Sequence, residues 1–349
     1  MGIFKLPALP MLEVMKSLSL YEIIKLSMCS ERTGRWLGSI RPYRRALTVN
    51  ISFTAYASIA LTDNLELEHF HFQSNSSSRS KKSLYKKKDS KVRVNKKHSA
   101  FNLVNIAETH PSYYFYFNFK DELEGLLKIT GHLCSLFGIK INEATVSSAS
   151  NPNAPAIVME WMLKYQKGFR DFKIQCGKTS DTVTKYLLDN VHYGKTVFFH
   201  VNLTPEFKTD FKFDGEELEL RQSCWVTRDN LLSINCSRLY VCGSKFSDTD
   251  INAFLKHWMT NDLKFKEVWI EMDETYLCVL FSGIPVIQHD TGFERIYDRP
   301  NKLPVHMKGG IDIERYDGVT ATIIRNSDTR RLLRMFVWNN ENNGNLVFD

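Results

Sequence analysis

The chain has 349 residues, 43% of them hydrophobic and 12% aromatic, so it can bury a sizeable core and form two or three structural units, which excludes a disordered protein. Its formal net charge of +7 is concentrated in residues 74–98, where ten basic residues stand against one acidic residue. The rest of the chain therefore carries a net charge of −2 and offers no general basic surface for DNA or RNA, so the composition does not favour a nucleic-acid partner.

The beginning of the chain predicts neither a secretion signal nor a lipid anchor. Its apolar stretch is interrupted by Pro7, Pro10 and Glu13, and Leu6 stands where a myristoylation motif has a hydroxyl residue. The longest apolar run, residues 276–287, is far shorter than the roughly 20 residues that cross a bilayer. The seven cysteines are scattered and form no C-x-x-C pair, which indicates reduced thiols. We expect an intracellular protein, cytoplasmic, nuclear or both, with no membrane partner.

Two short helices are predicted at the N-terminus. The first has apolar residues at i, i+3, i+4 and i+7, namely Met11, Val14, Met15 and Leu18. Ser19 followed by Glu22 predicts the capping box of a second helix, and a third turn begins at Ser30 and runs towards Leu37. A unit of about 40 residues buries too little apolar surface to be stable alone. We therefore expect its apolar residues to contact a partner surface.

The region between residues 45 and 150 is predicted to contain extended segments, a loop and a helix. One or two strands are expected over residues 46–61, another strand over residues 112–119, and a helix over residues 122–139. Residues 74–98 are polar and highly charged, so they cannot offset the entropy of ordering, and the sequence predicts a disordered loop there.

The remainder of the chain alternates between helix and strand. Helices are predicted over residues 157–167, 179–191 and 247–259, and strands over residues 169–175, 195–203, 217–222, 237–244 and 265–272. Strand centres recur every 20 to 30 residues or so, which favours a short, irregular, leucine-rich-repeat-like α/β array, while a conventional βαβ sheet also fits. Asp317-Gly318 predicts a β-hairpin, and a further strand over residues 332–339 completes the strands that close the array.

Two segments resemble a known family. The residues "VMKSLSLYEIIKLSMCSERT", which follow the Leu6-Pro7 pair, resemble the F-box in the divergent form of a large nematode-expanded family. Further on, "RLYVCGSKFSDTDINAFLKHWMTNDLKFKEVWIEM" resembles an F-box-associated domain of the second type, and "IERYDGVTATI" is similar to the end of that domain. The first match covers about 40 residues, and the two segments occur in the order that the family has.

The resemblance implies a non-catalytic adaptor that needs no cofactor. In that family the F-box docks on the Skp-type adaptor of an SCF-type cullin ubiquitin ligase, and the C-terminal domain holds a protein substrate, which the sequence does not identify. The docking residues that follow from it are Leu6, Pro7, Leu9, Val14, Met15, Leu18 and Ile24. Two alternatives stay open: these residues pack onto the protein's own body, or the chain is a ligase-independent solenoid interaction module, for example a nuclear one.

The predicted organisation is therefore α/β with a small helical N-terminus. An F-box is expected at residues 1–45, a connecting region at residues 46–150 and a repeat-like substrate-binding region at residues 151–349, with the F-box-associated domain at about residues 195–275.

Enzyme and metal sites are not favoured. The sequence contains no G-x-G-x-x-G, P-loop, G-x-S-x-G or H-E-x-x-H motif, and Asp189, His192 and Asp214 are ordinary polar residues near element ends. His69 and His71 are two residues apart, but two ligands do not make a metal site.

Two further features have structural and functional interpretations. The basic loop at residues 74–98 is interpreted as solvated chain, with a nuclear import signal as the alternative. Phe254, Leu255 and Trp258 belong to the family motif, and we expect them in the core rather than in a substrate contact.

Overall fold

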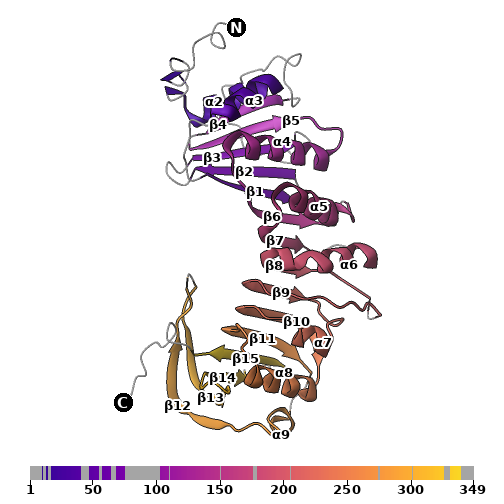
Figure 1. The fold of residues 1–349 in the computed structure, drawn as a ribbon, viewed down its shortest axis with the longest axis vertical. Coiled ribbons are helices and arrows are strands. Elements are labelled where there is room, and N and C mark those ends of the chain that lie inside the picture. Colours follow the sequence, from indigo (N-terminus) through magenta and orange to yellow (C-terminus); the bar gives the residue numbers. More distant parts are fainter. Residues whose placement is uncertain are drawn as a thin grey trace. The chain divides into compact units, whose positions relative to one another are not determined.

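The structure is a computed structural model, and its elements are drawn in Figure 1. It describes residues 10, 13–14, 17–40, 47–54, 57–63, 68–74, 103–109, 111–149, 151–175, 179–204, 206–273, 276–300, 302–325 and 331–338. The chain forms two compact units, Met1–Lys173 and Ile174–Asp349.

The first unit begins with a helical hairpin. It consists of α2 (Leu20–Cys29) and α3 (Glu31–Ile40). The Ser19 hydroxyl accepts a hydrogen bond from the Glu22 backbone N–H, and the Glu22 carboxylate accepts one from the Ser19 N–H, so the predicted capping box is confirmed. The predicted basic loop and most of the first predicted helix lie outside the described residues.

The sheet of the first unit follows the hairpin. Its strands occur in the order β7-β6-β1-β2-β3-β5-β4. Their bounds are β1 (Leu47–Phe53), β2 (Ala57–Asp63), β3 (Glu68–Ser74), β4 (Leu103–Thr109), β5 (Ser112–Phe117), β6 (Ile141–Ser147) and β7 (Phe169–Gln175). The pairs β1/β6 and β3/β5 are parallel, and the pairs β1/β2, β2/β3 and β4/β5 are antiparallel. Alternating burial in β2 gives the sheet one buried face.

Two helices cover that sheet. α4 (Glu122–Phe137) packs on β1 and β2, and α5 (Ala154–Gln166) packs on β6. Asp121 caps α4 at its N-terminus, and Gly138 ends it in the left-handed conformation with φ of 65°, which a glycine adopts without steric cost. These helices confirm the two predicted for this part of the chain.

The second unit contains a parallel set of four strands. They are β8 (Gly194–His200), β9 (Glu217–Arg221), β10 (Arg238–Phe246) and β11 (Glu267–Met272), and each is paired with the next in chain order. The helical elements of this part of the chain are α6 (Asp181–Asn190), the 3-10 turn η3 (Val191–Tyr193), α7 (Arg228–Leu232) and α8 (Asp248–Thr260). Figure 1 shows α7 and α8 on one side of the strands.

Four antiparallel strands extend this sheet beyond β11, after the short helix α9 (Leu277–Leu280). They are β12 (Ile287–Tyr297), β13 (Val305–Glu314), β14 (Thr320–Arg325) and β15 (Leu332–Val337), in the order β12-β13-β14-β15-β11. The hairpin predicted at Asp317-Gly318 is confirmed, because Glu314 pairs with Thr320 across that turn and Gly318 has a φ of 85°.

The helix-bearing face of the second unit is its core. The strand residues on this face are buried, namely Leu218, Leu220, Leu239, Val241, Val268 and Ile270. From α8 come Phe254, Leu255 and Trp258, each 0% exposed, which confirms that this part of the family motif is core. The mixed α/β class is also confirmed, whereas the leucine-rich-repeat-like description stays a prediction. None of the helices in the described ranges is long and apolar enough to cross a membrane.

Candidate functional site

The predicted docking residues fall in two groups. Leu6, Pro7, Leu9 and Met15 lie outside the described residues. Val14 is half-buried, Leu18 is half-buried against the cluster of Ile23, Leu37 and Leu136, and Ile24 is 0% exposed. Ile24 therefore contributes to packing inside the first unit, and the structure does not bring it to the surface.

The hairpin is attached to α4 and β5 by apolar and polar contacts. Ile23 and Leu37 pack on Leu136, and the ring of Tyr21 stacks on Tyr113 with 4.8 Å between ring centroids. The hydroxyl of Ser27 lies 2.9 Å from Nε2 of His132. The helical hairpin, which is too small to be stable alone, therefore packs one of its faces against the rest of the first unit.

Close approach between α3 and α4 also constrains His132. A Cβ atom on Gly34 would lie 2.6 Å from Cε1 of His132, so a larger residue there would collide with the ring. Burial lowers the pKa of His132 to about 4, an effect that the nearby Glu31 carboxylate opposes only in part. The imidazole is consequently neutral at pH 7.

A second candidate surface is the face of the second unit's sheet on which the described residues place no helix, called here the helix-free face. Glu217, Arg238 and Glu267 lie side by side in neighbouring strands. Two residues further along the strands, Tyr240, Trp269 and Arg334 also lie side by side. Directly paired residues point to the same face of a sheet, and so do residues two apart in one strand. The face opposite the buried leucines is thus lined by charged and aromatic side chains.

The aromatic part of this helix-free face forms a short stack. The rings of Tyr240 and Trp269 meet edge to face with centroids 5.6 Å apart. The guanidinium of Arg334 lies over Trp269 at 5.3 Å, and the ammonium of Lys302 lies over Tyr240 at 5.3 Å. Tyr240, Trp269 and Arg334 are all half-buried, so the stack is partly open to solvent.

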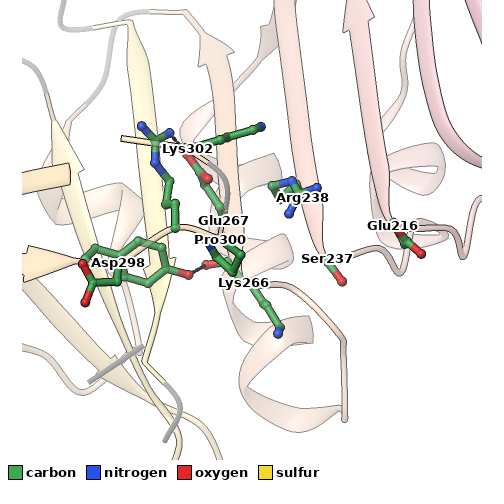
Figure 2. A pocket seen from close by; sticks show the side chains of 10 residues that line it. Glu216, Ser237, Arg238, Lys266, Glu267, Asp298, Pro300 and Lys302 are labelled. Carbon is green, nitrogen blue, oxygen red and sulfur yellow. Dashed lines mark hydrogen bonds and ion pairs between the residues drawn. The ribbon is translucent and has the colours of Figure 1, made fainter. Parts of the chain in front are cut away.

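A pocket of about 160 Å³ lies at one end of this face, where the strands β10 and β11 begin (Figure 2). Arg238 and Glu267 start these strands, and Asp298, Pro300 and Lys302 come from the loop between β12 and β13. The remaining lining residues are Glu216, Ser237, Lys266, Tyr297 and Arg299. Figure 2 shows Arg238 beside Glu267, with the loop residues across from them.

An ion-pair network surrounds the pocket. Nε of Arg238 donates to the carboxylate of Glu217 at 2.7 Å, and Nζ of Lys302 donates to the same carboxylate at 3.2 Å. Nη1 of Arg299 donates to Glu267 at 3.2 Å. Glu217 and Glu267 are 7% and 1% exposed, so each buried carboxylate has a cationic partner, as burial of a charge requires.

The same burial affects the phenols beside the network. Burial, reinforced by the negative charges of Glu267 and Glu217, raises the pKa of Tyr240 well above its usual range. Burial and Glu267 likewise raise the pKa of Tyr297, whose hydroxyl donates to the backbone carbonyl of Lys266 at 2.8 Å. Both phenols therefore remain protonated hydrogen-bond donors at physiological pH.

These residues were not singled out from the sequence. Arg238, Tyr240, Trp269 and Arg334 alternate with buried apolar residues in their strands, and this alternation is the signal that could have identified them. This alternation shows which side chains point away from the core, but it does not show that strands β10, β11 and β15 are neighbours.

The other polar residues considered in the sequence lie elsewhere. Asp189 and His192 line a separate hollow of about 540 Å³ in the second unit, with Asp210 and Asp229, whereas Asp214 does not. His69 and His71 lie on β3, where His71 stacks on a tyrosine ring of β5. Across the described ranges, no group of three or more His, Cys, Asp or Glu residues could hold a metal ion.

Comparison with known proteins gives a family for part of the chain. Residues 206–264 match the F-box associated family. This segment contains β9, α7, β10 and α8, so it supplies Arg238 and Tyr240 of the helix-free face and lies inside the predicted range of about residues 195–275.

Similar proteins come from Caenorhabditis elegans. The uncharacterized protein F59B2.9 is 23% identical over 97% of this chain and 79% of its own length. The Skn-1 dependent zygotic transcript 15 protein is 25% identical over 60% of this chain and 62% of its own length, and the uncharacterized protein F59B2.8 is 28% identical over 32% and 28%. No solved structure matches the chain. The predicted family resemblance is thus confirmed: a segment of the chain matches the F-box associated family, and similar proteins over most of its length occur in a nematode.

Proposed function

We propose that this protein is a substrate-recognition adaptor of an SCF-type cullin ubiquitin ligase. The observation that carries the proposal is the F-box associated match at residues 206–264, preceded in the chain by a capped helical hairpin with the residue pattern of an F-box. In this proposal the N-terminal segment docks on a Skp-type adaptor and the second unit holds a protein substrate. The chain itself performs no chemistry, and tethering raises the effective concentration of the substrate's lysines near the ubiquitin-charged enzyme.

The proposed set of docking residues is smaller than the set that the sequence predicts. Ile24, together with Ile23 and Leu37, is used for packing within the first unit. The proposed anchors are therefore Leu6, Pro7, Leu9, Val14 and Met15, with Leu18 at the margin. Apolar anchors in a groove each contribute roughly 1–3 kcal/mol to binding, so losing two of them would lower affinity by orders of magnitude.

The burial of the hairpin decides which variant to test. Deleting residues 1–40 would remove α2 and α3 and expose Leu136 of α4, so loss of binding could then reflect unfolding. The variant Val14→Asp with Met15→Asp avoids this deletion, because it retains all residues of α2, α3 and α4. A matched control is Ser39→Asp with Thr182→Asp, which adds the same two charges at exposed positions.

The experiment is a pull-down of the full chain against a purified Skp-type adaptor. We expect the unmodified chain and the control to retain the adaptor and the Val14→Asp/Met15→Asp variant to lose it. Absence of binding by all three proteins would contradict the proposal. The preferred function would then be the alternative that the contacts of α2 and α3 with α4 support, namely a ligase-independent interaction module whose N-terminal helices stabilise its own fold.

A further inference from the structure

The acidic and basic side chains of the helix-free face differ in how many of their hydrogen-bonding groups already have a partner. Each of its four glutamates has a donor: Glu217 and Glu267 have the network described above, Glu219 accepts from Arg221, and Glu271 accepts from the Gly243 backbone N–H at 2.7 Å. The carboxylates of this face therefore have no need of a ligand that donates hydrogen bonds.

The arginines of the same face retain free donors. Considering the residues that the structure describes, the Arg238 guanidinium uses only Nε, on Glu217, and the Arg334 guanidinium donates no hydrogen bond. Arg334 is nonetheless held in place by its stacking on Trp269. A planar guanidinium fixed on an aromatic ring with its terminal nitrogens unused is preorganised to bind a carboxylate or phosphoryl group.

The two arginines are separated by a definite distance. Arg238 on β10 and Arg334 on β15 lie on either side of β11, and their partners on β11, Glu267 and Trp269, are two residues apart. Neighbouring strands are about 4.8 Å apart and two residues of a strand span about 6.8 Å, so their backbones are separated by roughly 12 Å. An extended peptide covers that distance in three to four residues.

We propose that the helix-free face binds an extended acidic segment of the protein substrate, with one anionic side chain at Arg238, at the mouth of the 160 Å³ pocket, and a second at Arg334. The aromatic rings of Tyr240 and Trp269 lie between the two arginines and pack against the backbone of the bound segment. The anionic group is a carboxylate or a phosphoryl group, since both present oxygens to an arginine in the same planar arrangement. This inference rests on the proposed function, in which the second unit holds the substrate.

The test uses the full chain and labelled peptides, and measures binding by fluorescence anisotropy. The probes are fluorescein-labelled Gly/Ser dodecapeptides that carry two glutamates, two phosphoserines or two lysines, in each case three residues apart. We expect the anionic peptides to bind and the lysine peptide not to bind. The tighter of the two anionic peptides identifies the group that the face prefers.

The main variant is Arg334→Gln, because the Arg334 guanidinium makes no hydrogen bond whose loss would disturb the fold. We expect it to weaken binding of the anionic peptides by tenfold or more, and Arg334→Lys to restore only part of this loss, because an ammonium lacks the planar pair of donors. Arg238→Lys tests the second position while keeping a cation beside the buried Glu217. The control is Lys212→Gln, which removes one positive charge at an exposed position outside the face.

Three results would overturn the inference. They are absence of binding by both anionic peptides, equal weakening by Lys212→Gln and Arg334→Gln, and tighter binding of a single-stranded oligouridine than of either peptide. None of these measurements involves the Skp-type adaptor, so their outcome is independent of the pull-down, and failure of one proposal is distinguishable from failure of the other.

Discussion

The imidazole of His132 links α4 to the hairpin through the Ser27 hydroxyl. The Ser27 hydroxyl donates to the backbone carbonyl of Ile24 at 2.8 Å, so its oxygen is available to accept the Nε2–H of a neutral imidazole. Protonation of the ring would place a charge in this half-buried contact. The residue therefore couples the attachment of the hairpin to pH.

The stability of the first unit should fall as the pH decreases from about 6.5 to about 4. The folded-state pKa of His132 is about 4, below its ordinary value of 6.5, so the unfolded chain binds the proton more readily and acid favours unfolding. The full effect corresponds to about 3 kcal/mol in the free energy of unfolding. Urea unfolding at pH 4.5 and pH 7, followed by circular dichroism, measures it.

The variant His132→Gln should reduce the difference in unfolding free energy between these two pH values. His306→Gln, at an exposed position on β13, is the matched control and should leave the difference unchanged. An unaltered pH dependence in the His132→Gln protein would show that other groups cause it.

At the scale of elements, α8 is fixed by its cap and by its buried side. The Ser247 hydroxyl accepts from the Asp250 backbone N–H at 3.3 Å, and the Asp250 carboxylate accepts from the Ser247 backbone N–H at 3.0 Å. Ile251, Phe254, Leu255 and Trp258 then face the sheet with no exposed surface. The capping box satisfies two backbone donors that the first turn would otherwise leave unpaired.

Replacing the cap should destabilise the second unit moderately. We expect Ser247→Ala to lower the free energy of unfolding by about 1 kcal/mol, as loss of a side-chain cap typically does, and Ser247→Asp to restore most of it. Thermal unfolding followed by circular dichroism tests this. If Ser247→Ala and Ser247→Asp were equally destabilised, the cap would not be the cause.

At the scale of the whole molecule, the chain divides into two compact units, each with buried apolar residues. Leu136 belongs to the core of the first unit, and Leu255 to that of the second. Units with their own cores usually open as separate cooperative elements. A defect in one core should therefore remain confined to its unit.

The variant Leu136→Ala tests this independence. Truncating this buried leucine should cost about 2–5 kcal/mol in the first unit. Hydrogen exchange read by mass spectrometry should show faster exchange in α2, α3 and α4, with β10 and β11 unchanged. Faster exchange in β10 and β11 to the same extent would indicate that the whole chain unfolds as one cooperative unit.

The sequence predicted those elements whose signal is local. The cap at Ser19, the buried side of α8 with Phe254, Leu255 and Trp258, and the turn at Asp317-Gly318 each depend on residues within a few positions of one another, and all are found as predicted. Other elements were not predicted from the pattern, among them α7 and β12. β12 is an edge strand with mostly exposed residues, so it lacks the alternating burial on which prediction depends.

The sequence by itself therefore determined the α/β class, the capped helices and the family resemblance, because hydrophobic periodicity, caps and motifs are local properties of the chain. Only the tertiary structure decided that Ile24 and Leu37 are used for packing within the first unit, and that Arg238, Tyr240, Trp269 and Arg334 share one face. Strand order joins Arg238 to Arg334 across nearly a hundred residues, and pairing over such a separation is set by the packing of the whole sheet, which no local pattern specifies.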